Sequence, residues 1–304
     1  MHIAVIIPAY NAAAYLPDAM ASVVAQVHSD WSMVVVDDGS TDATADIATD
    51  FPDRRIRLVC QANAGVSAAR NRGLHAVTAD AFLFLDADDW LAPDALMRLA
   101  KALDSRPEAI AASGRPARVA RDRSIYPMRP PPEGDLLERL LVRNLFVNGG
   151  HLLIRSQALR AAGGFREDLC YGEDWEYWIR LAAQGPFAAL PEHKAPVLFV
   201  RETPGSAYLR LATDPTNFAA NLDAIYDNPA VLRRFPPSRL KDLRRRAEAE
   251  MAWVIGRELI RHGRLGDGWR WLGRSLRQAP TLKRIGLVGL SWTGLGPFRP
   301  YLAA

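Results

Sequence analysis

Residues 3–89 alternate between short unbroken apolar runs and segments with helical periodicity. The apolar runs are IAVIIPAY, WSMVVVDD, IRLVC and AFLFLDADD. Runs such as MVVV and FLFL contain no alternating polar residue, which is typical of strands buried on both faces. Strands separated by helices need right-handed crossovers, so the pattern predicts a mostly parallel sheet with helices on both faces. With 304 residues, 49% of them hydrophobic, the chain is long enough to bury such a core.

The remainder of the chain predicts a change of organisation. Residues 114–134 are rich in proline and arginine and predict an irregular excursion. Helices are expected at 135–142, 156–162 and 173–184, with strands in HLLIR and APVLFVR. From about residue 237 only helical patterns remain, and two of them, joined by a glycine-containing turn, predict an antiparallel helical pair. We therefore expect an α/β domain over residues 1–230 and a C-terminal helical extension over residues 231–304.

Positive charge is concentrated near the C-terminus. Residues 231–284 hold 15 lysines and arginines against five acidic residues, so this segment carries +10 and the remainder −6. Two interpretations stay open, which are attraction to an anionic surface and an ordinary solvated helical face. In the first interpretation, the anionic surface is a membrane leaflet or a polyanion. We expect peripheral contact with a membrane, and we expect no binding to nucleic acid. No apolar run could span a bilayer and no signal peptide is evident, which predicts a cytoplasmic protein at the inner face of the membrane.

A polar cluster follows each of the four predicted strands. The clusters are Pro8-Ala9-Tyr10-Asn11, residues 37–42 with the sequence DDGSTD, Asn63-Ala64-Gly65, and Asp86-Ala87-Asp88-Asp89. Open parallel sheets bind ligands beyond the carboxyl ends of their strands. All four clusters should therefore lie on one rim of the sheet.

Three carboxylates, those of Asp86, Asp88 and Asp89, follow one buried apolar run within four positions. Carboxylates held this close repel one another and raise each other's pKa, and a divalent cation removes that cost. Oxygen ligands favour Mg²⁺ or Mn²⁺, and Asp86 with Asp88 would leave coordination positions for water and substrate phosphate oxygens. The alternative is that the aspartates only cap the following turn, and for Asp89 both interpretations stay open.

Other residues on this rim fit a nucleoside diphosphate. Tyr10 could stack on a planar ring, and Asp38 could accept hydrogen bonds from a base or from ribose hydroxyls. Arg70, just inside a helix start, could neutralise phosphate oxygens. Each residue taken singly also fits ordinary turn chemistry, but together they describe a nucleotide and its metal.

Five motifs resemble, in order, those of family 2 inverting glycosyltransferases with the GT-A fold. They are IPAYN, VVVDDGSTD, NAGVSAARNRG, FLDADDW and GGFREDLCYGEDWEYWIRLA, and the resemblance covers residues 3 to about 206. It implies a metal-dependent transfer of a sugar from a nucleotide-diphosphate donor, with a UDP-sugar favoured, to a glycan or lipid-linked acceptor. Cell-surface polysaccharide assembly is the implied setting, and Mn²⁺ or Mg²⁺ the implied cofactor.

The resemblance also implies roles for single residues. Asp174 matches the catalytic base, with Glu173 as an alternate or as a carboxylate that orients the acceptor, although from the residues alone both could be ordinary helix N-terminal acids. Asp88 matches the direct metal ligand, with Asp86 nearer the donor ribose or sugar. The implied nucleotide-sugar positions are Pro8, Tyr10, Asn11, Asp38, Asn63, Arg70, Asp86 and Ala87. We expect the acceptor near Asn148, His151 and Trp175.

One position departs from the family pattern. Thr203 stands where relatives often carry a histidine, so its role would fall to His151, His193 or Arg201, or metal binding would be weaker. This departure keeps a non-catalytic nucleotide-sugar-binding relative as an alternative function. A nucleotidyltransferase that forms sugar nucleotides is less favoured, because PAYNAAAYLP lacks a glycine- and arginine-rich loop with a lysine. A dehydrogenase is disfavoured because no G-x-G-x-x-G follows a strand.

Overall fold

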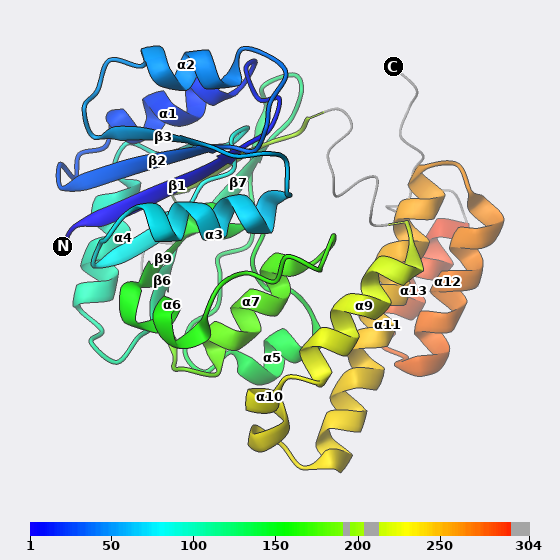
Figure 1. Cartoon of the computed structure of the whole chain (residues 1–304). Helices are drawn as coiled ribbons and strands as arrows, with labels where there is room; N and C mark the ends of the chain where they lie inside the picture. Colours follow the sequence, from blue (N-terminus) through cyan, green and yellow to red (C-terminus); the bar gives the residue numbers. More distant parts are fainter. Residues whose placement is uncertain (191–194, 204–212, 293–304) are drawn as a thin grey trace. The chain divides into compact units, whose positions relative to one another are not determined.

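The computed structural model of the chain describes residues 1–190, 195–203 and 213–292 (Figure 1). The chain divides into two compact units. Unit 1 comprises Met1–Leu137, Leu145–Asp168 and Glu173–Pro204, and unit 2 comprises Glu138–Asn144, Leu169–Gly172 and Gly205–Ala304. Because unit 2 takes in the chain from residue 205 onward, it includes the helices Pro215–Tyr226 and Pro229–Arg234 as well as the helices that follow them. The functional boundary between residues 230 and 231 stays a prediction.

Unit 1 is built on a seven-stranded sheet with the order β10-β6-β9-β4-β1-β2-β3. The pairs β1–β2, β2–β3, β1–β4 and β6–β10 are parallel, and β9 is antiparallel to both of its neighbours. The mostly parallel sheet that the apolar runs predict is thus confirmed. Its strands are β1 Ile3–Ala9, β2 Trp31–Asp37, β3 Ile56–Cys60, β4 Ala81–Phe84, β6 Ala111–Ser113, β9 Leu152–Arg155 and β10 Phe187–Ala189.

Helices cover both faces of this sheet, as Figure 1 shows for α1 and α2 on one side and α3 on the other. Alternate residues of one strand serve the two faces, because Val5 joins the core under α1 and α4, whereas Ile6 lies against Gly73 of α3. Strands buried on both faces carry no polar alternation, which explains the unbroken runs. The helices are α1 Leu16–Val24, α2 Thr44–Asp50, α3 Val66–Ala76, α4 Ala95–Asp104, α6 Ser156–Ala162 and α7 Glu173–Ala182.

A second, four-stranded sheet with the order β5-β11-β7-β8 corrects one prediction. The proline- and arginine-rich residues 114–134 are not an irregular excursion, because β7 (Pro116–Val119) and β8 (Ile125–Pro127) form an antiparallel pair. Two prolines are tolerated in this pair, because Pro116 is the first residue of β7 and Pro127 lies in the exposed edge strand β8. β5 (Trp90–Leu91) pairs with β11 (Leu198–Arg201), which in turn pairs with β7. This sheet therefore brings the segment that follows Asp89 beside the segment that precedes Thr203.

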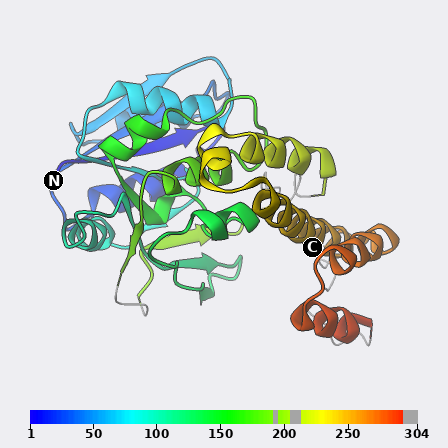
Figure 2. The ribbon, with the colours of Figure 1, turned by 90° about the horizontal axis from the view of Figure 1, so that it is seen from below.

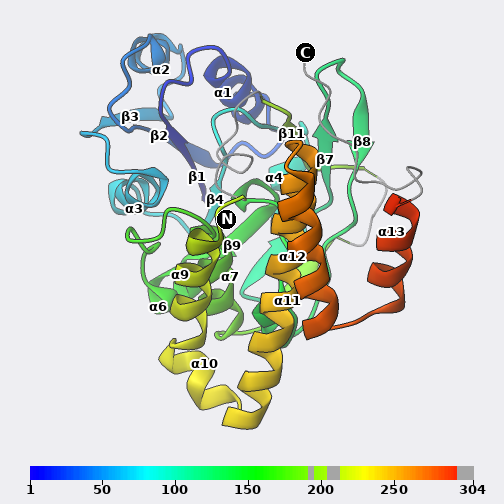
Figure 3. The ribbon, with the colours of Figure 1, turned by 90° about the vertical axis from the view of Figure 1, so that its right-hand side faces the viewer.

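Unit 2 is helical. The predicted antiparallel pair is confirmed by α11 and α12, which lie side by side in Figure 3. A Cβ at Gly268 would stand 2.7 Å from the carbonyl oxygen of Gly256, so the two backbones meet where neither has a side chain. Helix α13 follows as a separate short helix (Figure 2). The helices are α5 Leu137–Val142, α9 Pro215–Tyr226, α10 Pro229–Arg234, α11 Pro237–Arg261, α12 Leu265–Gln278 and α13 Leu282–Trp292. Among the described residues, no helix has the length and apolar character needed to cross a bilayer.

The packing of α3 on β1 gives a test of unit 1. We expect Gly73→Ala to lower the free energy of unfolding by about 1–3 kcal/mol, because the new Cβ would stand 2.5 Å from a side-chain carbon of buried Ile6. The same substitution at Gly273 in α12 meets nothing closer than 3.7 Å and should stabilise by about 0.5–1 kcal/mol through helix propensity. Urea unfolding measures both, and a Gly73→Ala protein as stable as the parent would contradict this packing.

Candidate functional site

The sheet register brings the first three polar clusters together at one rim. Ala9 pairs with Asp37, and Asp37 with Cys60, at the carboxyl ends of β1, β2 and β3. The clusters then bond directly to one another. The backbone N–H of Asn11 donates to Ser40 Oγ at 2.9 Å, and the N–H of Thr41 donates to Asn11 Oδ1 at 2.8 Å. The predicted common rim is therefore present.

Asp38 shapes this rim from inside. Its buried carboxylate accepts hydrogen bonds from Gln61 Nε2 at 2.7 Å and from the backbone N–H groups of Ala64 and Gly65 at 2.9 and 2.8 Å. Three of its roughly four acceptor positions are thus occupied, which leaves one for a ligand. The bonds hold the loop that presents Asn63, an exposed residue.

Tyr10 lies open on the same rim, with 53% of its surface exposed, and Asn11 is exposed beside it with a positive φ of 48°. Pro8, by contrast, is a buried residue of β1 and can support a ligand only through its neighbours. Tyr10, Asn11 and Asn63 are therefore predicted nucleotide-contacting residues that the structure leaves exposed.

Arg70 links two distant parts of the chain. This buried residue of α3 donates from Nη2 to Asp86 Oδ1 at 3.1 Å and from Nη1 to Glu173 Oε1 at 3.0 Å. Burial alone would lower the pKa of Arg70, but the nearby carboxylates outweigh it and raise the pKa above its usual value. The guanidinium therefore holds the end of β4 against the start of α7.

The turn after β4 is braced from several sides. Thr203 Oγ1 donates to Asp88 Oδ2 at 3.2 Å, and Arg201 Nε donates to the backbone oxygen of Asp88 at 3.0 Å. Burial and the neighbouring Asp86 carboxylate raise the pKa of Asp88. A threonine at position 203 thus still contacts the predicted metal-binding motif.

Asp89 proves to be a buried anchor rather than a surface cap. Its carboxylate accepts hydrogen bonds from Asn148 Nδ2 at 2.7 Å and from the backbone N–H of Arg201 at 3.0 Å. Burial, with Asp86 and Asp88 nearby, raises the pKa of Asp89 well above its usual range. The third carboxylate of the cluster therefore positions the turn.

The three predicted acceptor residues are all buried, and their role toward an acceptor stays a prediction. Asn148 bonds to Asp89 and accepts from the N–H of Gly150 at 2.9 Å. His151 Nδ1 lies 2.9 Å from the Gly114 oxygen, and burial lowers its pKa to about 4, so the ring is neutral. Trp175 is 7% exposed. Of the residues considered in place of the family histidine, His151 packs inside, Arg201 braces Asp88, and His193 lies outside the described residues.

Glu173 and Asp174 open α7 but differ in environment. Glu173 is paired with Arg70, whereas Asp174 Oδ1 accepts from the backbone N–H of Trp175 at 2.6 Å. Burial and the charge of Glu173 raise the pKa of Asp174 to about 7, although Arg70 acts in the opposite direction. A carboxylate with a pKa in this range can exchange a proton near neutral pH, as a general base must.

The carboxylates suit a divalent cation whose shell is completed by ligand. The described residues contain no group of three or more His, Cys, Asp or Glu side chains arranged to hold a metal. Asp88 accepts the Thr203 hydrogen bond through Oδ2, and Asp86 accepts the Arg70 hydrogen bond through Oδ1, so each carboxylate has a second oxygen to offer. Two hard oxygen donors beside open rim residues fit Mg²⁺ or Mn²⁺ bound partly through water and phosphate oxygens.

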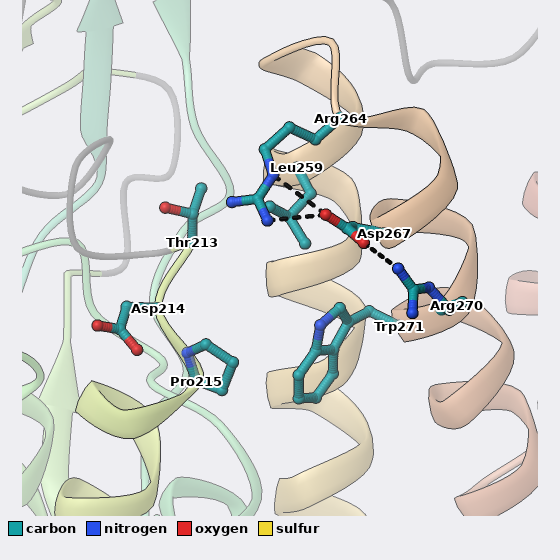
Figure 4. A pocket seen from close by; sticks show the side chains of 8 residues that line it. All are labelled: Thr213, Asp214, Pro215, Leu259, Arg264, Asp267, Arg270 and Trp271. Carbon is teal, nitrogen blue, oxygen red and sulfur yellow. Dashed lines mark hydrogen bonds and ion pairs between the residues drawn. The ribbon is translucent and has the colours of Figure 1, made fainter.

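Unit 2 contains a separate hollow of about 480 Å³ that the sequence did not indicate (Figure 4). Trp271, Leu259 and Pro215 supply its apolar surface. Arg264 and Arg270 share one partner, Asp267, at 2.7 Å for Arg264, and Asp214 supplies a second carboxylate, so the lining carries no net positive charge. The hollow is therefore not an anion site.

Comparison with known proteins identifies the family. The model of the family described as "Glycosyl transferase family 2" matches residues 4–162, just over half of the chain. The chain belongs to this family. The motifs from IPAYN to FLDADDW lie inside the matched segment, and the predicted family membership is confirmed.

Individual relatives of this family 2 member match over shorter segments. Glycosyltransferase GlyA of Streptococcus pneumoniae is 43% identical over 101 residues, which are 33% of this chain and 14% of GlyA. The uncharacterized glycosyltransferase alr2836 of Nostoc is 46% identical over 102 residues, which are 33% of this chain and 32% of that protein. The chain thus aligns with less than a third of the length of either relative.

Solved structures confirm the GT-A fold. Residues 1–349 of Staphylococcus aureus TarS, in complex with UDP-GlcNAc, superpose with a TM-score of 0.60 at 15% identity, covering 100% of this chain and 93% of that one. The mannosyltransferase PcManGT of Pyrobaculum calidifontis, with GDP-Man and Mn²⁺, gives a TM-score of 0.59 at 21% identity, covering 96% and 79%. At these identities the likeness concerns the fold.

The environment of Asp174 gives a test that needs no substrate. The pKa of Asp174 is about 7 in the folded chain and 3.8 ordinarily. The buried carboxyl therefore lowers the free energy of unfolding as pH rises from about 4 to about 7, and the full cost is present above about pH 7. We expect Asp174→Asn to raise the free energy of unfolding, by about 2–3 kcal/mol more at about pH 8 than at about pH 5. Urea unfolding at both pH values measures this, with Asp46→Asn as an exposed carboxylate control. An equal effect at both pH values would contradict the assignment.

Proposed function

We propose that this protein is an inverting glycosyltransferase that moves a sugar from a nucleotide-diphosphate donor to a glycan or lipid-linked acceptor. The observation that carries the proposal is the Arg70 bridge between Asp86 and Glu173. The bridge sets the predicted donor and metal carboxylates beside the predicted base, although about 90 residues of chain separate them.

The donor is proposed to lie along the rim formed by the ends of β1 to β4. Tyr10 would stack on the base, Asp38 has one acceptor position left for it, and Asn63 stands exposed next to them. TarS and PcManGT, which share the fold, were solved with UDP-GlcNAc and GDP-Man. A UDP-sugar is the donor that we favour.

Asp88, with Asp86, would hold Mn²⁺ or Mg²⁺. Such a cation, when bound, supplies positive charge to the diphosphate that leaves. PcManGT was solved with Mn²⁺ and GDP-Man, which supports a divalent cation in this fold. The chain's own contribution is to fix Asp88 through Thr203, Arg201 and the Asp89 anchor.

Asp174 is proposed to take the proton of the acceptor hydroxyl as that oxygen attacks the anomeric carbon. A single displacement from the side opposite the diphosphate inverts the anomeric configuration and needs no covalent enzyme intermediate. Glu173, neutralised by Arg70, would orient the start of α7 instead of serving as an equal alternate base.

The acceptor is proposed to be a growing cell-surface glycan or its lipid-linked precursor. One relative, 42% identical over 90 residues, is the putative teichuronic acid biosynthesis glycosyltransferase TuaG of Bacillus subtilis. The matched residues are 29% of this chain and 36% of TuaG.

Nucleotide binding tests the donor and metal parts. We expect one of UDP, GDP, CDP and dTDP to raise the melting temperature only when Mn²⁺ is present, because a ligand at about 100 times its Kd adds about 2.7 kcal/mol to stability. Asp88→Asn should abolish the shift, while Asp104→Asn, an exposed carboxylate on α4, should keep it. Stabilisation that is equal with and without metal, or unchanged in Asp88→Asn, would refute the metal assignment.

The rate–pH profile tests the base. Asp174 acts only when deprotonated, so kcat/KM should rise with pH through about 7 and then level off. Asp174→Asn should reduce release of the nucleoside diphosphate by about 10²–10⁴-fold. Glu173→Gln should reduce the release of nucleoside diphosphate by a smaller factor, and its kcat/KM should still rise with pH. If Glu173→Gln abolished the rise and Asp174→Asn kept it, the two roles would have to be exchanged.

A further inference from the structure

Helix α13 presents an open apolar face. Leu282 and Ile285 are 90% and 52% exposed, and Gly286 and Gly289 lie on the same side at spacings of four and seven residues from Leu282. A Cβ built at either glycine would meet no atom of the described chain within 4 Å. The face therefore combines exposed hydrocarbon with bare backbone.

The orientation of this face is fixed from the opposite side of α13. Arg284 is buried there, pairs with Glu250 of α11 at 2.6 Å and donates to the backbone oxygen of Ala279 at 2.8 Å. Its guanidinium also lies 5.8 Å from the centre of the Trp253 ring. These contacts hold α13 to the helical pair with Leu282 and Ile285 facing outward.

Accessible positive charge lies on the last two turns of α12, the helix that precedes α13 in the chain and contacts it. Arginines of α11 that lie beside acidic side chains are neutralised by them. Arg244, for example, pairs with Asp223 and Glu248. Arg274 and Arg277 of α12 are exposed, and no carboxylate of the described residues pairs with them. Arg277 precedes Leu282 by only five residues. The basic C-terminus thus keeps exposed positive charge in several places, at Arg233, Lys241, Arg246 and the end of α12, and of these the end of α12 lies nearest to α13 in the chain.

We propose that this surface, made of Leu282 and Ile285 with Arg274 and Arg277, docks on an anionic lipid bilayer. Hydrocarbon side chains next to guanidinium groups match acyl chains beneath phosphate headgroups. With 11 residues at about 1.5 Å each, α13 is too short to cross a bilayer and would lie in its plane. This inference deepens the proposed function, because a membrane-bound transferase would meet a lipid-linked acceptor at the bilayer surface.

Charge also decides between a bilayer and a second copy of the chain. A two-fold interface through this face would use the same patch on both copies, so it would bring Arg274 and Arg277 toward their own equivalents. Like charges without intervening acids oppose such packing. An anionic bilayer instead offers opposite charge to the arginines and hydrocarbon to the leucine and isoleucine.

Vesicle flotation of the full chain, without nucleotide or metal, tests this proposal. We expect binding to vesicles of phosphatidylcholine with phosphatidylglycerol and weak binding to phosphatidylcholine alone. Leu282→Asp with Ile285→Asp should weaken binding by about 100-fold or more. The matched control is Val27→Asp with Met97→Asp, which changes two exposed apolar residues of unit 1 and should leave binding unchanged.

The arginines are tested separately. Arg274→Gln with Arg277→Gln should weaken binding to the anionic vesicles by about 25-fold, at about fivefold for each arginine near the surface. Arg54→Gln with Arg121→Gln removes the same charge from exposed positions of unit 1 and should have little effect. Equal loss in both pairs would mean that total charge, and not this surface, drives binding.

Two further outcomes would overturn the proposal. The first is a concentration-dependent dimer, seen by light scattering and dissociated by the Leu282→Asp and Ile285→Asp changes, in a protein that binds no vesicles. The second is equal binding of parent and variants to anionic vesicles. Metal-dependent nucleotide binding, measured on the same variants, should stay intact, so failure of the docking surface and failure of the transferase proposal are told apart.

Discussion

The candidate site depends on one buried guanidinium, that of Arg70. A buried charge without partners is strongly destabilising, so this arginine requires carboxylates around it, and it takes one from the end of β4 and one from the start of α7. Five acidic residues, Asp86, Asp88, Asp89, Glu173 and Asp174, gather in the same region, and Arg70 is the fully buried cation that the described residues place among them. Burial, together with the negative charge left over after this pairing, raises the pKa of both Asp88 and Asp174. The same cluster of buried and charged groups thus determines both the geometry and the proton affinity of the site.

The sequence predicts the parts of the site that follow from strand order. Unbroken apolar runs indicate buried parallel strands, whose carboxyl ends share an edge, and the polar clusters after β1 to β4 duly meet there. The sequence does not show which residues that are far apart in the chain become hydrogen-bond partners. Asn148 and His151, polar residues beside two glycines, resemble a ligand loop, yet their bonds go to Asp89 and Gly114 inside unit 1. The β7–β8 pair was missed for a related reason, since composition describes a segment and pairing decides its structure.

The second sheet explains how a threonine can stand at position 203. β11 pairs with β5, which begins directly after Asp89, and this pairing carries Arg201 and Thr203 to the Asp88 turn. Arg201 lies 4.7 Å from the centre of the Trp90 ring, so the guanidinium is stacked as well as bonded. The turn is therefore fixed by backbone pairing and by Arg201, and the side chain at 203 adds one hydrogen bond to a carboxylate already in place.

Excess negative charge also bears on how the proposed donor would bind. A diphosphate carries the same sign of charge as the site, and Arg70, the nearest buried cation, is already committed to Asp86 and Glu173. Repulsion between the diphosphate and this cluster falls only when positive charge enters with it. The same cation would lower the pKa of Asp88 and Asp174, because positive charge favours their ionised forms. We therefore expect donor and metal to bind cooperatively and to leave Asp174 better able to accept a proton than it is in the empty site.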